Sequence, residues 1–349
     1  MKELIQSVYR PQRKKKIGLN ISQIYKQSET YFFSNARYAL LEGLKILQAK
    51  PEQKILIPEF ICCHLLAPLN ILGLKILYYS LNQSLEPTAP EHWPKADYII
   101  AVNYFGVAQN LAPFKKYCVQ NQALLIEDNA HGFLSRSEEG SLLGERGDIG
   151  ITSLRKVVNI ANGGLLHFVR DDLKKLAKRH FIQPLLIEPS PLFNLKLVLK
   201  SMIATLGAKE ILGLININRK IRKIVKGYEI PLGSEIDEYE IGEKINTCDI
   251  NNFIGKLDLD FEVSRRRKLY LELGNLFSGL PVKIIFKDLP DSTSPMGFPF
   301  IFDPKDENMI MHELKKIGLE FYIWPSLPLE IRKQEQSFYN KIGCVRFLW

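Results

Sequence analysis

Short β-branched runs alternate with helical periods between Ser34 and Phe168, and this alternation constrains the fold more than any other feature of the sequence. The segments near residues 37–48, 61–72 and 111–118 are amphipathic and long enough for crossover helices. Strands that alternate with helices form a parallel sheet with helices on its faces. The sequence therefore predicts an α/β domain, with strands over residues 54–57, 74–79, 98–102, 123–127, 149–153 and 164–169.

The remainder of the chain changes character. Residues 170–240 are basic and helical in pattern, with a proline-rich interruption at 187–191. A further helix is predicted to begin near Asp249. In the tail, the predicted elements are strands over 283–286, 297–302 and 319–323 and a helix over 306–317. We therefore predict an N-terminal arm (1–27), a large α/β domain (28–240, of which 170–240 is the helical, basic part) and a small C-terminal α+β domain (241–349).

The composition is that of a folded protein. Hydrophobic residues make up 46% of the 349 residues and charged residues 24%, close to the average of globular domains. The 47 Lys and Arg against 38 Asp and Glu give a net charge of +9, which allows an anionic partner without specifying one. The cysteines are odd in number and lack CxxC spacing, so neither a disulfide framework nor a metal site is predicted.

Two features bear on where the protein works. The N-terminal residues carry charge but no apolar run of signal-peptide length, so a cytoplasmic location is predicted. The longest apolar region, residues 193–214, contains Lys196, Lys200, Lys209 and Glu210, which are costly at the centre of a bilayer. We therefore expect a buried or interfacial helix there, and no membrane span.

Two basic runs, residues 218–223 and 265–268, have helical spacing. Interleaved aliphatic residues make the first run more typical of a solvated helix face than of a nucleic-acid site, and the second run is interpreted in the same way. We expect no nucleic-acid partner. The alternative, that these runs bind nucleic acid, predicts binding that weakens steeply as the salt concentration rises.

Polar residues gather just beyond the ends of the predicted strands, where open parallel sheets bind ligands. After the predicted strand 123–127 come Asp128 and His131. The predicted strand 149–153 ends at Ser153 and is followed by Arg155, Lys156, Gly163 and Gly164. Ahead of the first helix, residues 33–37 form a turn of small residues whose free amides suit an anion.

A carboxylate, a lysine and a helix N-terminus at one crevice are what pyridoxal 5′-phosphate (PLP) requires. Lys156 would form a Schiff base with the cofactor aldehyde, for which it must be a neutral amine, and a partly desolvated pocket beside Arg155 would lower its pKa in that direction. Asp128 would keep the pyridine nitrogen protonated, while amides and hydroxyls would hold the phosphate. Taken one at a time, these residues are also compatible with structural roles.

The order of these residues resembles that of the DegT/DnrJ-like sugar aminotransferases, a family of fold-type I PLP enzymes, over residues 33–325. The acidic motif EDxAH of this family corresponds to residues 127–131, and its lysine segment with flanking glycines corresponds to residues 144–164. Its opening SGRxAL resembles residues 35–40, and its NxxDINAAIG segment resembles residues 246–255. By this resemblance the fold is that of a fold-type I PLP-transferase, with a large, mostly parallel mixed-sheet domain and a smaller C-terminal α+β domain.

The resemblance implies catalytic roles for three residues. Lys156 would be the lysine that bonds to the cofactor, Asp128 would partner the pyridine nitrogen, and His131 would lie near the phenolic oxygen of the ring. The segment from Ser153 to Lys156 is two residues shorter than the common family pattern and matches a side branch that reads SLRK. Because the lysine is retained, catalysis is still expected.

The resemblance also implies the residues that bind the cofactor. Ser153 and the amides of Ala36 and Arg37 would hold the phosphate, and Asn246 would reach it from the partner subunit of a homodimer with shared active sites. Cys62 stands where the family often places an aromatic residue against the ring. Further along, Tyr322 and Trp324 are candidates for the substrate pocket, with a role in the core equally open.

The implied activity is transfer of an amino group, commonly from glutamate, to a keto sugar carried on a nucleotide, in polysaccharide or antigen biosynthesis. A PLP-dependent sugar dehydratase is a rival, but those enzymes carry histidine in place of the lysine, and Lys156 argues against it. The other rival is a catalytically degenerate relative that binds PLP or a nucleotide sugar without turnover. The chain stops at Trp349, before the family's LPxH segment, so the C-terminal edge of the sugar pocket is expected to differ.

Overall fold

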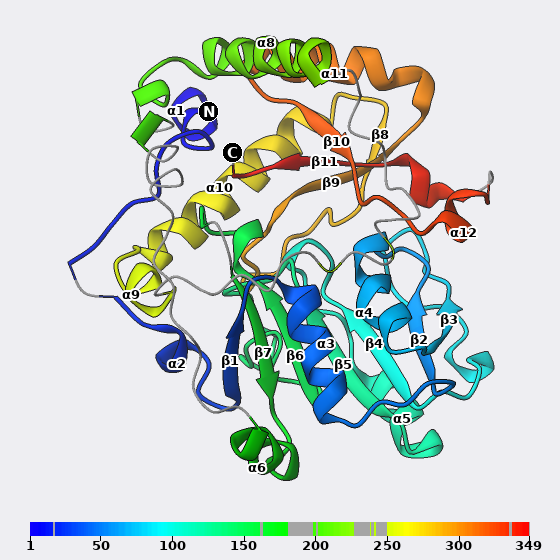
Figure 1. The fold of residues 1–349 in the computed structure, drawn as a ribbon. Coiled ribbons are helices and arrows are strands. Elements are labelled where there is room, and N and C mark those ends of the chain that lie inside the picture. The colour runs from blue at the N-terminus through cyan, green and yellow to red at the C-terminus, as the bar shows by residue number, and fades with distance from the viewer. Residues whose placement is uncertain are drawn as a thin grey trace.

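The computed structural model describes residues 1–16, 18–160, 163–180, 198–199, 202–226, 238, 241, 250–334 and 337–348. Within these residues the chain is organised around a larger and a smaller β-sheet (Figure 1). Two of the predicted features, the proline-rich interruption at 187–191 and Asn246, lie outside the described residues.

The larger sheet is mixed and mostly parallel. Its strands are β1 (Glu29–Phe33), β2 (Lys54–Pro58), β3 (Lys75–Tyr79), β4 (Tyr98–Val102), β5 (Leu124–Asn129), β6 (Ile149–Ser153) and β7 (Gly164–Phe168). They lie in the order β1-β7-β6-β5-β4-β2-β3. Neighbours from β3 to β6 run parallel, whereas β7 runs antiparallel to both β6 and β1. The strands predicted for this domain are therefore confirmed, with ends that differ by two residues at most.

The edge strand β1 was not predicted from the sequence. All five of its residues are half-buried, so the strand has no alternation between buried and exposed side chains. Among the described strands it pairs with β7 alone, in a register that sets Glu29 opposite Phe168 and Phe33 opposite Gly164. Since period-2 alternation is the main signal for a strand, an edge strand that is partly covered on both faces escapes it.

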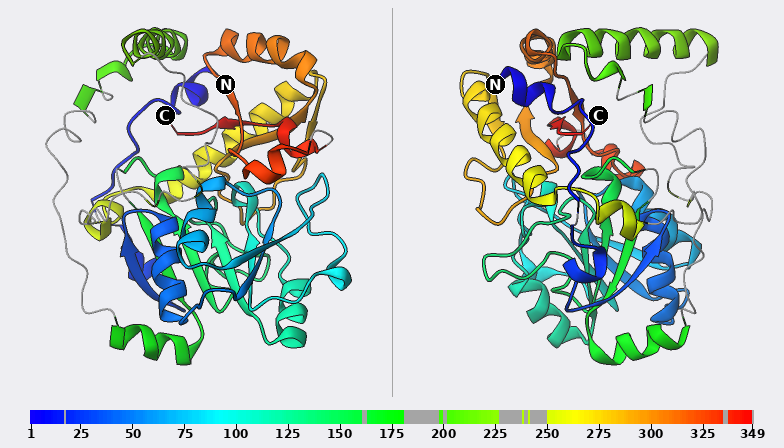
Figure 2. Two further views of the ribbon diagram at one scale, coloured as in Figure 1. Left: turned by 45° about the vertical axis from the view of Figure 1, so that its right-hand side comes forward. Right: turned by 90° about the vertical axis from the view of Figure 1, so that its left-hand side faces the viewer.

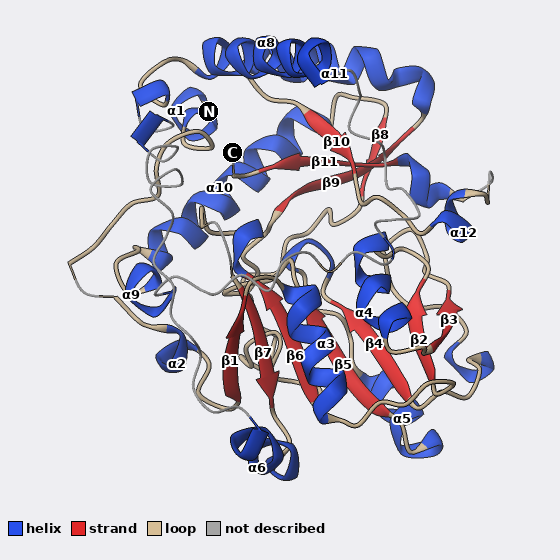
Figure 3. Cartoon of the chain, viewed as in Figure 1, coloured by secondary structure: helices blue, strands red, loops and turns tan. Residues whose placement is uncertain are grey.

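Helices cover both faces of the larger sheet. The relevant helices are α3 (Ala36–Ile46), α4 (Leu66–Ile71), α5 (Ala112–Asn121) and α6 (Asp171–His180). The two views of Figure 2 place α3 and α4 on one face and α5 on the other, and Figure 3 shows the same arrangement by type of element. The predicted crossover helices are thus confirmed, although the second begins as a 3₁₀ turn over Cys63–Leu65.

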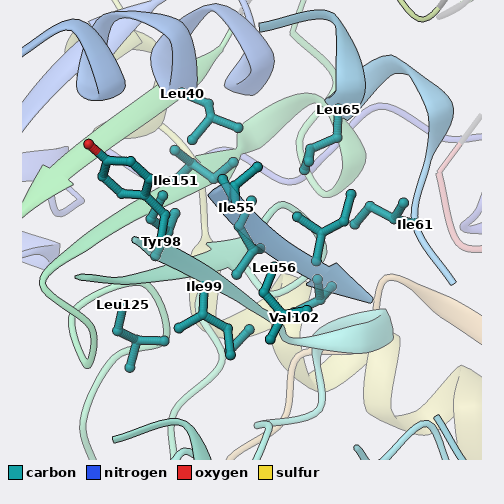
Figure 4. Close-up of a cluster of buried hydrophobic side chains, with 14 of the residues drawn as sticks. Leu40, Ile55, Leu56, Ile61, Leu65, Tyr98, Ile99, Val102, Leu125 and Ile151 are labelled. Carbon is teal, nitrogen blue, oxygen red and sulfur yellow. The ribbon is translucent and has the colours of Figure 1, made fainter. Parts of the chain in front are cut away.

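The core of this domain lies on both sides of the central strands. Figure 4 shows Ile55 and Leu56 of β2 among apolar side chains from α3, β4, β5 and β6. Successive residues of a strand point to opposite faces, yet both of these side chains are fully buried. Burial on both faces is characteristic of a parallel sheet between two layers of helices, and it explains the unbroken apolar runs in the sequence.

The smaller sheet is antiparallel and has a core of its own. Its strands are β8 (Val282–Ile284), β9 (Gly297–Phe302), β10 (Phe321–Ile323) and β11 (Ile342–Arg346), in the order β10-β11-β9-β8. The strand β11 was not predicted, because Gly343 interrupts its short apolar run, although it pairs on both sides. Phenylalanine rings in tilted and T-shaped contacts fill this core, and Ile5, Val8 and Tyr9 from the start of the chain join them.

The other described helices are α1 (Lys2–Gln6), α2 (Ile21–Ile24), α8 (Ala208–Lys226), α9 (Ile250–Ile254), α10 (Leu259–Phe277), α11 (Glu307–Ile317) and α12 (Leu329–Arg332). Figures 1 and 2 show α10 packed against the smaller sheet. They place α8 and α11 at the end of the molecule that is farthest from the larger sheet. Among the described residues, no helix has both the length and the apolar character needed to cross a bilayer. The predicted domain boundaries remain predictions.

The expectation that the basic run 265–268 forms a solvated helix face is wrong for its first half. Arg265 and Arg266 are 6% and 0% exposed and both pair with Glu262, one turn earlier in α10, at 2.6 Å. Arg266 also donates a 2.7 Å hydrogen bond to the carbonyl of Val157, directly after the predicted catalytic lysine. Charged residues at helical spacing are usually exposed, and the sequence does not show which distant segments will cover them in the fold.

The charges of this cluster depend on one another. Burial alone would raise the pKa of Glu262, but the charges and hydrogen bonds of Arg266 and Arg265 outweigh it and lower that pKa from 4.5 to about 2. A carboxyl group whose pKa is lower in the folded state stabilises the fold above its unfolded pKa. The stabilisation is therefore present above about pH 4.5 and is lost as the pH falls toward 2.

Replacing Arg266 by leucine should destabilise the protein strongly, because it breaks a buried ion pair and leaves backbone carbonyls without a donor. We expect the free energy of unfolding to fall by about 3–5 kcal/mol, measured by urea denaturation at neutral pH. As a matched control, Lys316→Met removes an exposed ion pair with Glu313 and should cost less than about 1 kcal/mol. Equal, small losses in the two variants would contradict a structural role for Arg266.

Candidate active site

A cavity of about 320 Å³ lies beyond the carboxyl ends of β2, β4, β5 and β6, where open parallel sheets place their ligands. The first turn of α3 and the segment after β10 complete its walls. The predicted site residues that line it are Ala36, Arg37, Cys62, Asp128, His131, Ser153 and Lys156. The structure therefore brings together every predicted site residue that it describes.

The start of α3 is built to leave free amides at the cavity. Asn35 is the N-cap residue, and its side-chain oxygen accepts a 2.9 Å hydrogen bond from the amide of Tyr38. Ala36 and Arg37 come next, in the first turn, where amides have no partner within the helix. The Arg37 side chain donates a 3.0 Å hydrogen bond to the carbonyl of Ile241. This first turn of an eleven-residue helix suits a phosphate.

The glycine pair joins this helix start to the lysine turn. The amide of Gly163 donates a 3.0 Å hydrogen bond to the carbonyl of Ser34, and its carbonyl accepts a 2.8 Å bond from the amide of Leu154. A Cβ atom at Gly164 would lie 2.6 Å from the nitrogen of Ala36 and still closer to Asn35. Only glycine allows the backbones to approach so closely, and that requirement accounts for the GG motif.

Lys156 ends the 3₁₀ turn Leu154–Lys156 that follows β6. Burial lowers the pKa of its amine, and the charges of Arg346 and Arg155 lower it further, while Cys62 and Asp128 act in the opposite direction. The ammonium group also lies 5.2 Å from the centre of the Trp324 ring. The site thus favours the neutral amine more than water does, as the sequence predicts for a nucleophilic lysine.

Asp128 reaches the cavity because side chains alternate along β5. Its neighbour Glu127 is fully buried away from the cavity, where Arg146 lies 2.6 Å from its carboxylate. Asp128 is 4% exposed and accepts a 2.8 Å hydrogen bond from the amide of Ala130. Burial raises the pKa of Asp128, and the charge of Lys156 opposes that shift. A cationic group bound against this carboxylate would keep it ionised.

His131 presents a neutral ring to the cavity. Its Nδ1 atom accepts a 3.1 Å hydrogen bond from the amide of Phe105, whose backbone is left-handed, with φ of 54°. Burial, followed by the charge of Lys156, holds the pKa of His131 well below its usual value of 6.5. A neutral imidazole that accepts at Nδ1 carries its proton on Nε2. His131 can therefore donate a hydrogen bond to a ligand oxygen, as its predicted place by the phenolic oxygen requires.

Cys62 follows β2 and lines the cavity at the predicted stacking position. A hydrogen bond with Cys63 and the charge of Lys156 lower the pKa of its thiol to about 6, although burial acts in the other direction. Phe60, two residues earlier, also lines the cavity, and its ring lies 5.4 Å from that of Tyr104. Which of these side chains faces a bound ring stays a prediction.

Sequence reasoning left out several residues of the cavity. Asn35 could have been recognised as a helix N-cap from its place before the first helical residue. Tyr104 gives no such short-range signal, because it enters the cavity from a turn. Of the two candidates left open, Trp324 lines the cavity, whereas Tyr322 does not and lies against Arg346.

A comparison with known protein families matches the part of the chain that carries most of the cavity residues. The model of the DegT/DnrJ/EryC1/StrS aminotransferase family matches residues 20–186, which carry Asp128 and Lys156. No curated protein sequence matches the chain.

Several solved structures are similar in fold. Helicobacter pylori PseC, an aminotransferase involved in the biosynthesis of pseudoaminic acid, is 13% identical, with a TM-score of 0.63 over 99% of this chain and 90% of PseC. Spr1654 from Streptococcus pneumoniae, a candidate sugar aminotransferase in its PLP form, is 15% identical, with a TM-score of 0.62 over 93% and 84% of the two chains. The GDP-4-keto-6-deoxy-D-mannose-3-dehydratase of E. coli, with bound hydrated PLP, is 13% identical, with a TM-score of 0.59 over 93% and 84%.

The mixed seven-stranded sheet and the smaller antiparallel sheet form the fold of the fold-type I PLP-transferases. Over residues 20–186, just under half of its length, the chain matches the model of the DegT/DnrJ/EryC1/StrS aminotransferase family. The predicted resemblance to this family, the fold class and the enzyme class are thereby confirmed. The roles assigned to individual site residues stay predictions.

Replacing Gly164 by alanine should disturb the site, because the added methyl group must displace the start of α3. We expect a loss of stability of about 1–3 kcal/mol in urea denaturation, together with weaker binding of PLP in an absorbance titration. Gly213→Ala is the control, since nothing lies within 4 Å of a Cβ atom at that exposed position in α8. That change should be neutral or slightly stabilising. A Gly164→Ala protein that bound PLP as tightly as wild type would refute the packing argument.

Proposed function

We propose that this protein is a PLP-dependent aminotransferase that transfers the amino group of glutamate to a keto sugar carried on a nucleotide. The observation that carries the proposal is the meeting of Lys156 and Asp128 in one cavity that the first turn of α3 also lines. The family match supports amino-group transfer, and the Spr1654 structures in PLP and PMP forms support the cofactor.

The residues present fit PLP. The cavity offers an amine, a buried carboxylate and a helix N-terminus, which are the groups that the aldehyde, the ring nitrogen and the phosphate of this cofactor need. Its volume of about 320 Å³ is within the range of small-molecule sites. Lys156 would hold the aldehyde end, Asp128 the ring nitrogen, and Ser153 with the amides of Ala36 and Arg37 the phosphate.

When bound, PLP supplies a cationic ring that withdraws electrons from the substrate carbon next to the transferred nitrogen. Asp128 keeps that ring protonated through its buried carboxylate. The amine of Lys156 would take the proton from the α-carbon of the amino donor, and its lowered pKa favours the neutral form that can do so. Because Nδ1 of His131 already accepts from the amide of Phe105, its Nε2 would donate a hydrogen bond to an oxygen of the bound cofactor.

The acceptor is proposed from the family and from charge. PseC, whose fold the chain shares, is an aminotransferase in the biosynthesis of pseudoaminic acid, and the net charge of +9 suits a nucleotide-linked substrate. We therefore place the reaction in the synthesis of an amino sugar for a polysaccharide or antigen. A cytoplasmic location remains a prediction.

We also propose a homodimer in which Asn246 of the partner subunit approaches the phosphate. Mixed dimers provide the measurement: an Asn246→Ala protein should bind PLP weakly, and subunits carrying a Lys156→Ala change should restore binding at one of the two sites. A protein that sediments as a monomer and is fully active under the same conditions would rule out the shared site.

The proposal predicts a visible absorption band for the purified protein with PLP, a shift of that band on adding glutamate, and loss of both in Lys156→Ala. We expect the rate of amino-group transfer to fall by at least about 100-fold in this variant. Wild-type protein that gives no band with added PLP would favour the degenerate relative, and a sugar dehydration product without amino transfer would favour the dehydratase.

Asp128→Asn separates binding from chemistry in the same assay. The neutral amide still fills the space and accepts the hydrogen bond from Ala130, but it cannot keep the ring nitrogen protonated. This variant should keep part of the cofactor band and lose most of the turnover. Unchanged kinetics would remove Asp128 from the mechanism.

A further inference from the structure

The helix α8 is attached to the rest of the molecule along one side. Ile211 and Leu212 are buried, and Ile211 belongs to the core of the smaller sheet. About two turns further on, Arg219 pairs with Glu320, just before β10, at 2.7 Å. These contacts hold the helix in place and leave its other side for a different neighbour.

That other side carries an exposed apolar stripe. Leu214, Ile217 and Ile221 are 44%, 56% and 53% exposed. Their spacing of three and four residues sets them above one another on one face of the helix, and we call these three residues the outer stripe. Ile217 lies about 200° around the helix from Ile215, which packs against the core of the smaller sheet. The outer stripe therefore plays no part in attaching α8 to the protein.

Exposed apolar side chains are concentrated in this part of the sequence. Among the residues that the structure describes, sixteen large apolar side chains are exposed, and seven of them lie between residues 198 and 221. Four of the seven precede α8, and the other three form the outer stripe. Single exposed apolar residues are common on protein surfaces, whereas a continuous apolar stripe indicates an interaction surface.

The place of α8 in the fold suits a broad partner. Figures 1 and 2 show the helix at the end of the molecule farthest from the larger sheet, and in the right-hand view of Figure 2 it extends past α11. A helix at the periphery can lie along an extended surface, which a stripe at the bottom of a groove could not reach.

The charge of α8 identifies the kind of surface. Its sequence contains six Lys or Arg residues and one acidic residue, Glu210, which lies in the first turn, where the helix dipole favours a negative charge. Lys209 and Lys220 are exposed, and Lys220 follows Ile217 by three residues, at the edge of the outer stripe. Lysine side chains can run along an apolar surface while their ammonium groups reach phosphates. An apolar stripe beside lysines is typical of helices that lie in the interface of an anionic bilayer.

We propose that the outer stripe of α8, together with Lys209 and Lys220, binds the protein to the surface of a membrane that contains anionic lipids. The apolar side chains enter the boundary between headgroups and acyl chains, and the lysines pair with lipid phosphates. The helix begins within the apolar region 193–214, for which the sequence predicts a buried or interfacial helix. The proposal goes beyond the proposed function and does not depend on it, since none of these residues lines the active-site cavity.

A second copy of the chain is the alternative occupant of the outer stripe. Pairing of two stripes about a two-fold axis would bring two basic helices together, and their like charges would repel each other. Anionic headgroups supply the opposite charge instead. The net charge of +9 on the whole chain acts in the same direction.

The test measures binding of the full-length protein to sucrose-loaded vesicles by sedimentation. One set of vesicles contains three parts of phosphatidylcholine to one part of phosphatidylglycerol, and the other contains phosphatidylcholine alone. Wild type should bind the anionic vesicles at least about 10-fold more tightly than the neutral ones, and added sodium chloride should weaken that binding. In the double variant Ile217→Gln with Ile221→Gln, binding to the anionic vesicles should weaken by about 10- to 100-fold, because two apolar side chains no longer leave water.

Two single variants serve as comparisons. Lys220→Gln should weaken binding to the anionic vesicles by about fivefold and leave binding to the neutral vesicles unchanged. Val119→Gln replaces an exposed apolar residue of α5, at the other end of the molecule, and should bind as wild type does. Glutamine is a good helix former and all the replaced side chains are exposed, so the urea denaturation curves of these proteins should match that of wild type.

The outcomes separate the membrane from the second copy. Wild type that stays unbound with the anionic vesicles would overturn the proposal, as would a double variant that binds them as tightly as wild type. Equal weakening in Val119→Gln would also overturn it, because the loss would not be specific to α8. A double variant that sediments without lipid as a smaller species than wild type would assign the outer stripe to a second copy of the chain.

Discussion

The close approach of Gly164 to the start of α3 is the constraint on which the active site depends. One antiparallel pair, β6 with β7, brings the glycines beside the lysine turn, and the register of β7 with β1 sets Gly164 opposite Phe33, just before the helix. The turn that carries Lys156 and the helix that offers its amides are therefore fixed by the same strand.

The C-terminal part of the chain contacts the larger domain next to the lysine turn. Arg266 in α10 donates hydrogen bonds to the carbonyl of Val157, next to Lys156, and to the carbonyl of Pro295, just before β9. A buried guanidinium can serve both because its donors point in several directions at once. The smaller sheet is thus positioned relative to the lysine, and with it Trp324 and Arg346, which close the site from that side.

The sequence predicted the parts of the structure that depend on local pattern. Asp128 and Lys156 could be predicted as site residues because each follows the end of a continuous apolar run. The glycine pair 163–164 indicated a close turn after the lysine. Partners from distant parts of the chain could not be predicted. The half-buried edge strand β1 has no periodicity to recognise, the buried Arg266 has the spacing of an exposed residue, and Arg346 becomes distinctive only when β10 places two aromatic rings against it.

The charges of the site respond to its ligands in a consistent direction. Burial pushes both Lys156 and Asp128 toward their neutral forms, and each opposes the shift of the other. A cationic ring nitrogen against Asp128 would lower the pKa of that carboxyl group and restore its charge. Arg346 at present lowers the pKa of Lys156, so an anion that neutralises Arg346 would raise it.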